Sequence, residues 1–132
     1  MAENRAPIPA KEAQAPFFVG VDLGGTNIKI GVVDDRGQPL ILAAADGRPM
    51  VDDRGRPLAK LSVPTEVEKG AEDATQRMGE GVVRAISAAG IDAAQVPRVG
   101  LGSPGTMDIP AGKLVDPVNL RGPGWKGFPI RD

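Results

Sequence analysis

The sequence contains no cysteine and no histidine. Without thiols, neither a disulfide framework nor a thiolate zinc site can form within the chain. Without imidazole, the chain cannot assemble a Ser-His-Asp or a Cys-His nucleophile. Chemistry carried by these residues must therefore come from carboxylates, lysine, arginine, hydroxyls and backbone groups.

The chain also lacks an excess of charge and a long apolar run. Its formal net charge is -1 and its pI is about 5.5, so no basic surface for nucleic acid is expected. No apolar run reaches transmembrane length, and residues 1–16 lack the apolar centre of a signal peptide. These absences predict a soluble, cytoplasmic protein with neither a nucleic-acid nor a membrane partner.

Glycine and proline are abundant, with 18 and 13 residues, whereas Phe and Trp together number only four. Loops should therefore occupy much of the chain. The 132 residues are enough for one domain with a modest core. Residues 1–16, rich in Ala, Pro and charge, predict a mobile, disordered tail. The folded domain is expected over residues 17–132.

The most informative stretch is residues 17–33, where two apolar runs flank a polar turn. The runs are rich in Val, Ile and Phe, which predicts two strands of a hairpin. Asp22 ends the first strand, and Gly24-Gly25-Thr26-Asn27 follow it. Adjacent glycines let backbone N–H groups converge on a phosphate, as in a backbone nest. A plain tight turn with a solvated acid is the alternative.

A short repeat follows the hairpin. The sequence of residues 33–40 recurs at residues 51–58 with seven of eight positions identical. A tandem duplication is the simplest explanation, with an insertion at about residues 41–58. We expect a neutral loop or hairpin extension there, with Gly37 in a tight turn; a functional acidic loop is the alternative. The two copies are 18 residues apart. Because this number is even, the strand expected next, at residues 59–63, keeps its inward-facing and outward-facing positions.

Apolar residues spaced by three or four predict an amphipathic helix over residues 66–89. Thr65 is expected to cap this helix and Gly90 to end it. Gly79 and Gly81 should each weaken its middle by roughly 1 kcal/mol. A short strand is expected at residues 96–102. Turn residues dominate from there on, apart from a brief strand at 113–115.

Residues 100–105 spell Gly-x-Gly-x-x-Gly after a strand, but the context excludes the dinucleotide reading. Pro110 and Gly112 break the helix that should receive the pyrophosphate. A nucleophile elbow at Ser103 is excluded as well, since Leu101 stands where that motif needs glycine. No Walker A loop is present.

Three motifs, in this order, resemble the ROK family of sugar kinases, in particular bacterial glucokinases. They are residues 21–29 (Val-Asp-Leu-Gly-Gly-Thr-Asn-Ile-Lys), residues 100–108 (Gly-Leu-Gly-Ser-Pro-Gly-Thr-Met-Asp), and Asn119-Leu120 with Gly124-Trp125 and Pro129. The resemblance covers residues 17–132 apart from the insertion. It implies an α/β, ribonuclease-H-like fold of the actin-like ATPase type. Residues 17–132 would be its incomplete N-terminal lobe, a mixed sheet with a long helix.

The resemblance also implies a role for particular residues. The hairpin would hold the phosphates of ATP through Asp22, Gly24, Gly25, Thr26, Asn27 and Lys29. Asp22 would lie near Mg²⁺, through a water molecule. The sugar pocket would be lined by Ser103, Pro104, Gly105 and Asn119. Trp125 would pack within its loop rather than stack on a ligand.

In this family a carboxylate accepts the proton of the sugar hydroxyl while the γ-phosphoryl group is transferred. That base belongs to an Asn-Asp motif, and no Asn-Asp pair occurs in these 132 residues. The resemblance therefore places the base beyond Asp132, with the family's zinc site and most sugar ligands. We expect the N-terminal part of an ATP-dependent glucokinase that makes glucose 6-phosphate in glycolysis. The fragment alone should be inactive, and any homodimer would form through the missing domain.

Three alternatives stay open at this stage. One is a ROK kinase for another sugar, such as fructose or N-acetylmannosamine. Another is a ROK transcriptional regulator, although the 16 residues before Phe17 are too few for the helix-turn-helix that precedes the hairpin in such proteins. The last is a stand-alone fragment that acts only as a binding module.

Overall fold

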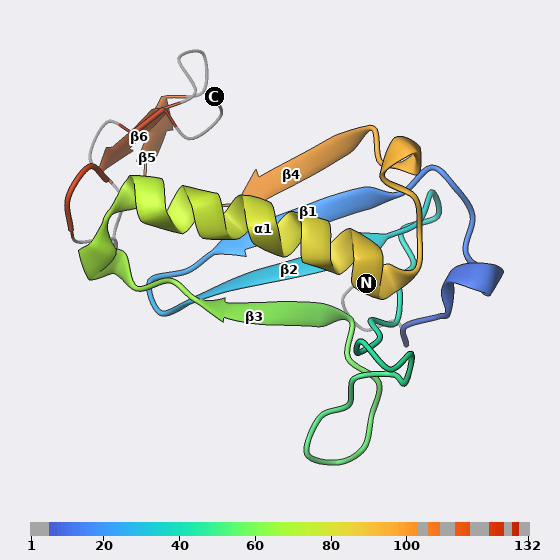
Figure 1. Ribbon diagram of the computed structural model, residues 1–132. Helices are drawn as coiled ribbons and strands as arrows, with labels where there is room; N and C mark the ends of the chain where they lie inside the picture. Colours follow the sequence, from blue (N-terminus) through green and yellow to red (C-terminus); the bar gives the residue numbers. More distant parts are fainter. Residues whose placement is uncertain (1–5, 103–105, 109–112, 117–121, 126–127, 130–132) are drawn as a thin grey trace.

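The computed structural model describes residues 6–102, 106–108, 113–116, 122–125 and 128–129. These residues form one α-helix, three short 3-10 helices and six strands (Figure 1). The strands are β1 (Phe18–Leu23), β2 (Asn27–Val33), β3 (Lys60–Pro64), β4 (Arg98–Gly102), β5 (Thr106–Asp108) and β6 (Lys113–Asp116). The helices are α1 (Ala71–Ala89), η2 (Ala10–Glu12), η3 (Val67–Lys69) and η4 (Ala93–Gln95).

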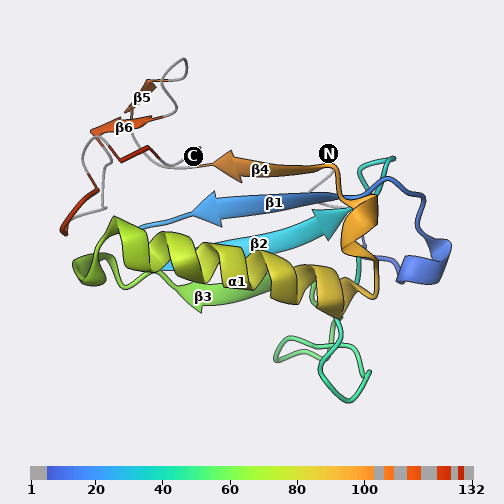
Figure 2. The same cartoon turned by 45° about the horizontal axis from the view of Figure 1, so that its top comes forward.

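A four-stranded mixed sheet in the order β3-β2-β1-β4 carries the fold. β1 and β2 form the predicted antiparallel hairpin, and β3 pairs antiparallel with β2. β4 pairs parallel with β1, so both strands end at the same edge of the sheet. Figure 2 shows α1 lying across one face of this sheet, as the crossover between β3 and β4. The predicted α/β fold is therefore confirmed, and β5 and β6 form a separate antiparallel pair.

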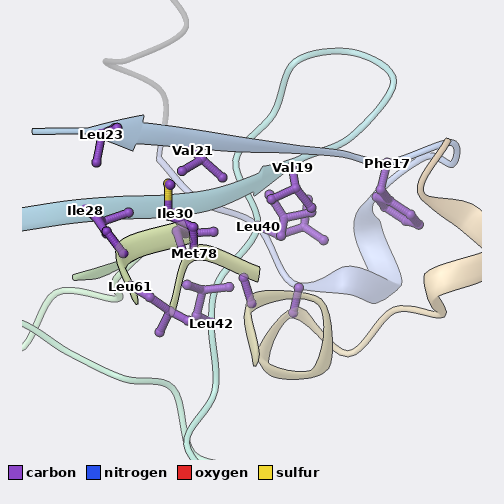
Figure 3. Close-up of a cluster of buried hydrophobic side chains, with 14 of the residues drawn as sticks. Phe17, Val19, Val21, Leu23, Ile28, Ile30, Leu40, Leu42, Leu61 and Met78 are labelled. Carbon is purple, nitrogen blue, oxygen red and sulfur yellow. The ribbon is translucent and has the colours of Figure 1, made fainter. Parts of the chain in front are cut away.

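The core lies between α1 and the sheet (Figure 3). Alternate residues of β1 and β2 point into it, which gives the strict alternation of buried and outward positions along β1. Met78 of α1 packs over Ile30 in the same cluster. The buried strand residues are Val19, Val21, Leu23, Ile28, Ile30 and Val32. Within the described part of the chain, no helix is long and apolar enough to cross a membrane.

The helix starts five residues later than predicted. Glu66 has a left-handed backbone with φ 49°, residues 67–69 form η3, and α1 begins at Ala71 with Gly70 as its N-cap. Thr65 does not cap the helix, because its hydroxyl is used elsewhere. The predicted end is confirmed, since Gly90 adopts φ 74° and donates its N–H to carbonyls of the last turn.

The two glycines in the middle of α1 differ in their surroundings. Gly81 is buried against β2, and a Cβ built there would overlap Ile30 Cδ1. Gly79 is exposed and a Cβ there would meet nothing within 4 Å. Gly81 therefore lets the helix approach the sheet, whereas Gly79 carries only the intrinsic cost of glycine in a helix.

The segment between β2 and β3 forms three similar turns rather than two. The first turn precedes the predicted insertion at residues 41–58, and the other two lie within it. Antiparallel bridges close each of them, at Val33–Pro39, Ala43–Pro49 and Val51–Pro57. The middle turn was missed because it keeps only the Gly-x-Pro part of the repeat, at residues 47–49. Gly37, Gly47 and Gly55 all have φ between 77° and 83°, as the turn requires. The segment forms turns, and its role as a neutral extension stays a prediction.

Residues 6–16 differ from the mobile tail that the composition suggests. Ile8 pairs in parallel with Leu40, and its N–H donates to Pro39 O at 2.9 Å. Gln14 N–H donates to Asp34 Oδ2 at 3.0 Å. Burial alone would raise the pKa of Asp34, but hydrogen bonds from Gln38, Gln14 and Arg36 together lower it below its ordinary value.

The described residues near the end of the chain pack on the start of α1. Trp125 is buried, and its Nε1–H donates to Val67 O at 2.9 Å. Pro123 O accepts the N–H of Ala71 at 3.0 Å, at the first turn of the helix. The prediction that Trp125 is a packing residue is confirmed. The brief strand predicted at residues 113–115 is present as β6, whereas β5 was not predicted.

Candidate functional site

The candidate phosphate site is the turn that joins β1 to β2. Gly24 N–H donates to Asn27 O at 3.0 Å and closes the turn. A Cβ on Gly24 would lie 2.8 Å from that same oxygen, so only glycine fits here. Thr26 and Asn27 are exposed, as is Lys29 two residues along β2. The sequence-predicted donors thus surround one solvent-facing turn.

The buried residue Thr65 supports this turn from beneath. Its hydroxyl donates to Gly24 O at 2.7 Å, and its N–H donates to Thr26 O at 2.9 Å. Thr65 follows β3 directly, so it links the turn to the strand that pairs with β2. We call these two hydrogen bonds the Thr65 brace.

Arg77 of α1 holds the backbone around Thr65 in turn. Its guanidinium donates to Pro64 O and Thr65 O, and it pairs with Asp73 at 2.9 Å. The start of α1 is thereby tied to the end of β3. The turn is therefore connected to α1 through Thr65 and Arg77.

The parallel pairing of β1 and β4 brings the second glycine-rich motif to the same place. Asp22 is in register with Gly102 on β4 and with Lys29 on β2. A Cβ on Gly102 would lie 3.9 Å from Asp22 Oδ1. Gly102, the last residue of β4, therefore lies beside the Asp22 carboxylate. The predicted sugar residues Ser103, Pro104, Gly105 and Asn119 lie outside the described residues.

The chemistry of the turn suits a phosphate with its metal ion. A hydroxyl, an amide, an ammonium group and backbone N–H groups can donate to phosphate oxygens. Asp22 is an exposed carboxylate, as an outer-sphere partner of Mg²⁺ requires, since Mg²⁺ usually keeps several waters. Among the described residues, no group of three or more acidic side chains could hold a metal ion directly.

Comparison with known proteins identifies the relationship. A glucokinase from Thermotoga maritima is 31% identical over 115 residues, and a glucokinase from Halalkalibacterium halodurans is 27% identical over 116. A ROK hexokinase from Thermus thermophilus superposes with a TM-score of 0.59 at 32% identity. The chain is similar to glucokinases of the ROK family over most of its own length. No family model matches the chain.

A further ROK structure comes with ligands. It is a glucokinase from Streptomyces griseus in complex with glucose and AMPPNP, with a TM-score of 0.56 at 28% identity. These matches cover 87–88% of this chain but only 28–30% of the relatives. The chain thus spans less than a third of the length of the proteins it resembles.

Sequence reasoning missed two parts of this site. Thr65 was assigned to a helix cap, because a threonine before an acidic amphipathic run is a common capping signal. Its true partner is a carbonyl 41 residues earlier, a contact that only the β2–β3 pairing creates. Gly102 was noted as part of a glycine-rich motif, but its place beside Asp22 follows from the parallel pairing.

Proposed function

We propose that this chain provides the phosphate-binding part of an ATP-dependent sugar kinase that phosphorylates glucose to glucose 6-phosphate. The observation that carries the proposal is the position of Asp22. This carboxylate lies one residue before the end of β1, beside the glycine turn and in register with Gly102 at the end of β4. The match to glucokinases over 87% of the chain supports the choice of reaction.

The turn would hold the phosphates of ATP through the N–H of Gly25, with Thr26, Asn27 and Lys29 adding donors, while Gly24 shapes the turn because its own N–H is donated to Asn27 O. Asp22 would orient a water of the Mg²⁺ shell. The ion, when bound, neutralises charge that develops on the transferred phosphoryl group. We further propose that the sugar and its proton acceptor are held by residues outside the described range.

A first experiment tests the phosphate turn in this chain alone. Backbone amide shifts are followed by NMR while AMPPNP and MgCl₂ are added. We expect shifts at residues 24–27, and the Asp22→Asn variant should bind about 10–100-fold more weakly, the usual effect of removing an outer-shell partner. Asp35→Asn is the matched control, since Asp35 lies in a distant turn. Shifts elsewhere, or equal binding by all three proteins, would exclude this role for the turn.

A second experiment tests the reaction. The chain replaces the matching residues of the Thermotoga maritima glucokinase, and glucose-dependent ADP formation is measured. We expect turnover by the chimera, loss of most activity with Asp22→Asn, and none with the 132-residue chain by itself. Glucose phosphorylation by the chain alone would refute the inference that it lacks the base.

A further inference from the structure

The first and third turns of the insertion share sequence and structure. We call residues 33–40 the first unit and residues 51–58 the third unit. In each, the leading aspartate accepts two backbone N–H groups on Oδ1, from residues two and four positions later. In each, the glycine N–H also returns to the carbonyl of that aspartate at 3.0 Å. The two units therefore present the same backbone groups in the same arrangement.

The first unit is already a binding surface, because it holds residues 8–14 of the same chain. We call this segment the arm. At one end of the arm, Ile8 N–H donates to Pro39 O at 2.9 Å, and Ile41 N–H donates to Ile8 O at 2.8 Å. The arm thus adds a short parallel pairing to the edge of the unit.

The other end of the arm is held by the turn itself. Gln14 N–H donates to Asp34 Oδ2 at 3.0 Å, and Asp35 N–H donates to Gln14 O at 2.8 Å. Arg36 adds a bond to Glu12 O at 3.0 Å. All these partners on the arm are backbone groups, and Ala10 and Ala13 of the arm also pack against the hydrophobic core.

The third unit presents the same backbone groups with no other described segment bound to them, and its Asp52 Oδ2 accepts from Arg56 Nε at 2.9 Å, where the first unit has Gln38. Its leading carboxylate, Asp52, is 24% exposed, whereas that of Asp34 is 0% exposed. Val51 is 52% exposed and Leu58 is half-buried. The side chain of Arg54, which corresponds to Arg36, makes no hydrogen bond or ion pair to another described residue. Figure 1 shows the insertion projecting beyond the edge of the sheet, where a second segment can approach.

We propose that the third unit binds the arm of a second copy of this chain. The arm of the same chain is already placed on the first unit, and a copy of the surface that binds a segment should bind that segment again. Each chain then offers one open unit, and the arm of the second copy leaves its own first unit in order to bind there. The contact is heterologous, so it links copies head to tail and does not close as a symmetric dimer. A few backbone hydrogen bonds and one apolar contact predict weak binding, near the millimolar range.

The test uses a capped peptide with the sequence of residues 6–16, added to the isotope-labelled chain. We expect backbone amide shifts to move over residues 51–59 and to saturate at about millimolar peptide. Residues 33–41 should not respond, since the tethered arm competes there at high effective concentration. Shifts confined to residues 33–41, or no shifts at millimolar peptide, would overturn the proposal.

The decisive variant is Asp53→Pro, because it removes the backbone donor that the arm's Gln14 carbonyl needs, together with an exposed carboxylate whose counterpart on Asp35 makes no bond to the arm. Asp53 stands second in its turn, where proline is favoured, so the turn should survive. Binding should weaken at least tenfold, and Asp52→Ala should abolish it. Asp46→Ala, in the middle turn, is the matched control and should bind normally. Unchanged peptide affinity in Asp53→Pro with the native spectrum retained would refute the proposed surface.

Discussion

Removing the Thr65 hydroxyl should destabilise the phosphate turn locally, an effect that a change in packing alone would not produce. In Thr65→Val the side chain keeps its branched shape, the backbone bond to Thr26 O is retained, and Gly24 O loses its donor. An unsatisfied buried carbonyl costs about 1–3 kcal/mol. Gly24 is only half-buried, so water compensates in part. We therefore expect a loss of about 1–2 kcal/mol, concentrated in the turn.

Global stability alone cannot identify the cause. The control Thr65→Ser keeps the hydroxyl but removes a methyl group from a fully buried site. Losing that group costs about 1 kcal/mol through burial and packing. Urea unfolding should therefore place both variants below the wild type by similar amounts, and a local measurement must separate them.

Hydrogen exchange of the Gly24 amide is that measurement, because this N–H closes the turn onto Asn27 O. If the brace loses about 1.4 kcal/mol, opening of the turn becomes about tenfold more frequent. Thr65→Val should raise the Gly24 exchange rate by about that factor, whereas Thr65→Ser should leave it close to wild type. Equal Gly24 exchange in the two variants would refute the brace.

Two further predictions concern the helix and the first unit. Gly81→Ala should destabilise the chain by about 1–3 kcal/mol, because its Cβ would overlap Ile30. Gly79→Ala should stabilise the chain by up to about 1 kcal/mol, because a Cβ there meets nothing. Urea unfolding measures both changes, and the prediction is wrong if the two free energies of unfolding change in the same direction. The lowered pKa of Asp34 means that its contribution to stability is present above the ordinary carboxyl range and is lost as the pH falls through the folded-state value. Wild type should therefore lose more stability than Asp34→Asn below about pH 4, and parallel pH profiles would contradict the assignment.

The sequence predicted most of the fold because its strands and helix carry strong local signals. Val19 and Val21 alternate with outward residues, and the apolar face of residues 71–89 recurs at helical spacing. The helix start was misplaced, because Thr65 and the acids after it look like a cap. The arm was missed for a similar reason: residues 6–16 have no periodicity of their own, and their order comes from contacts with the first unit.

The position of the brace also explains how the insertion is tolerated. Thr65 meets Gly24 only because β3 pairs with β2 in one register, with Pro64 opposite Asn27. A shift of one residue would turn Leu61 from the core to the open face and move Thr65 away from the turn. Each turn between β2 and β3 is closed by its own bridge, and hydrogen bonds among Leu42, Met50 and Leu58 join the turns to one another. The segment is also fixed to α1, since Ala43 N–H donates to Ala88 O and Leu42 lies in the core. The phosphate turn therefore depends on the pairing of β3, and the added turns are accommodated because they pack on the fold and leave that pairing in register.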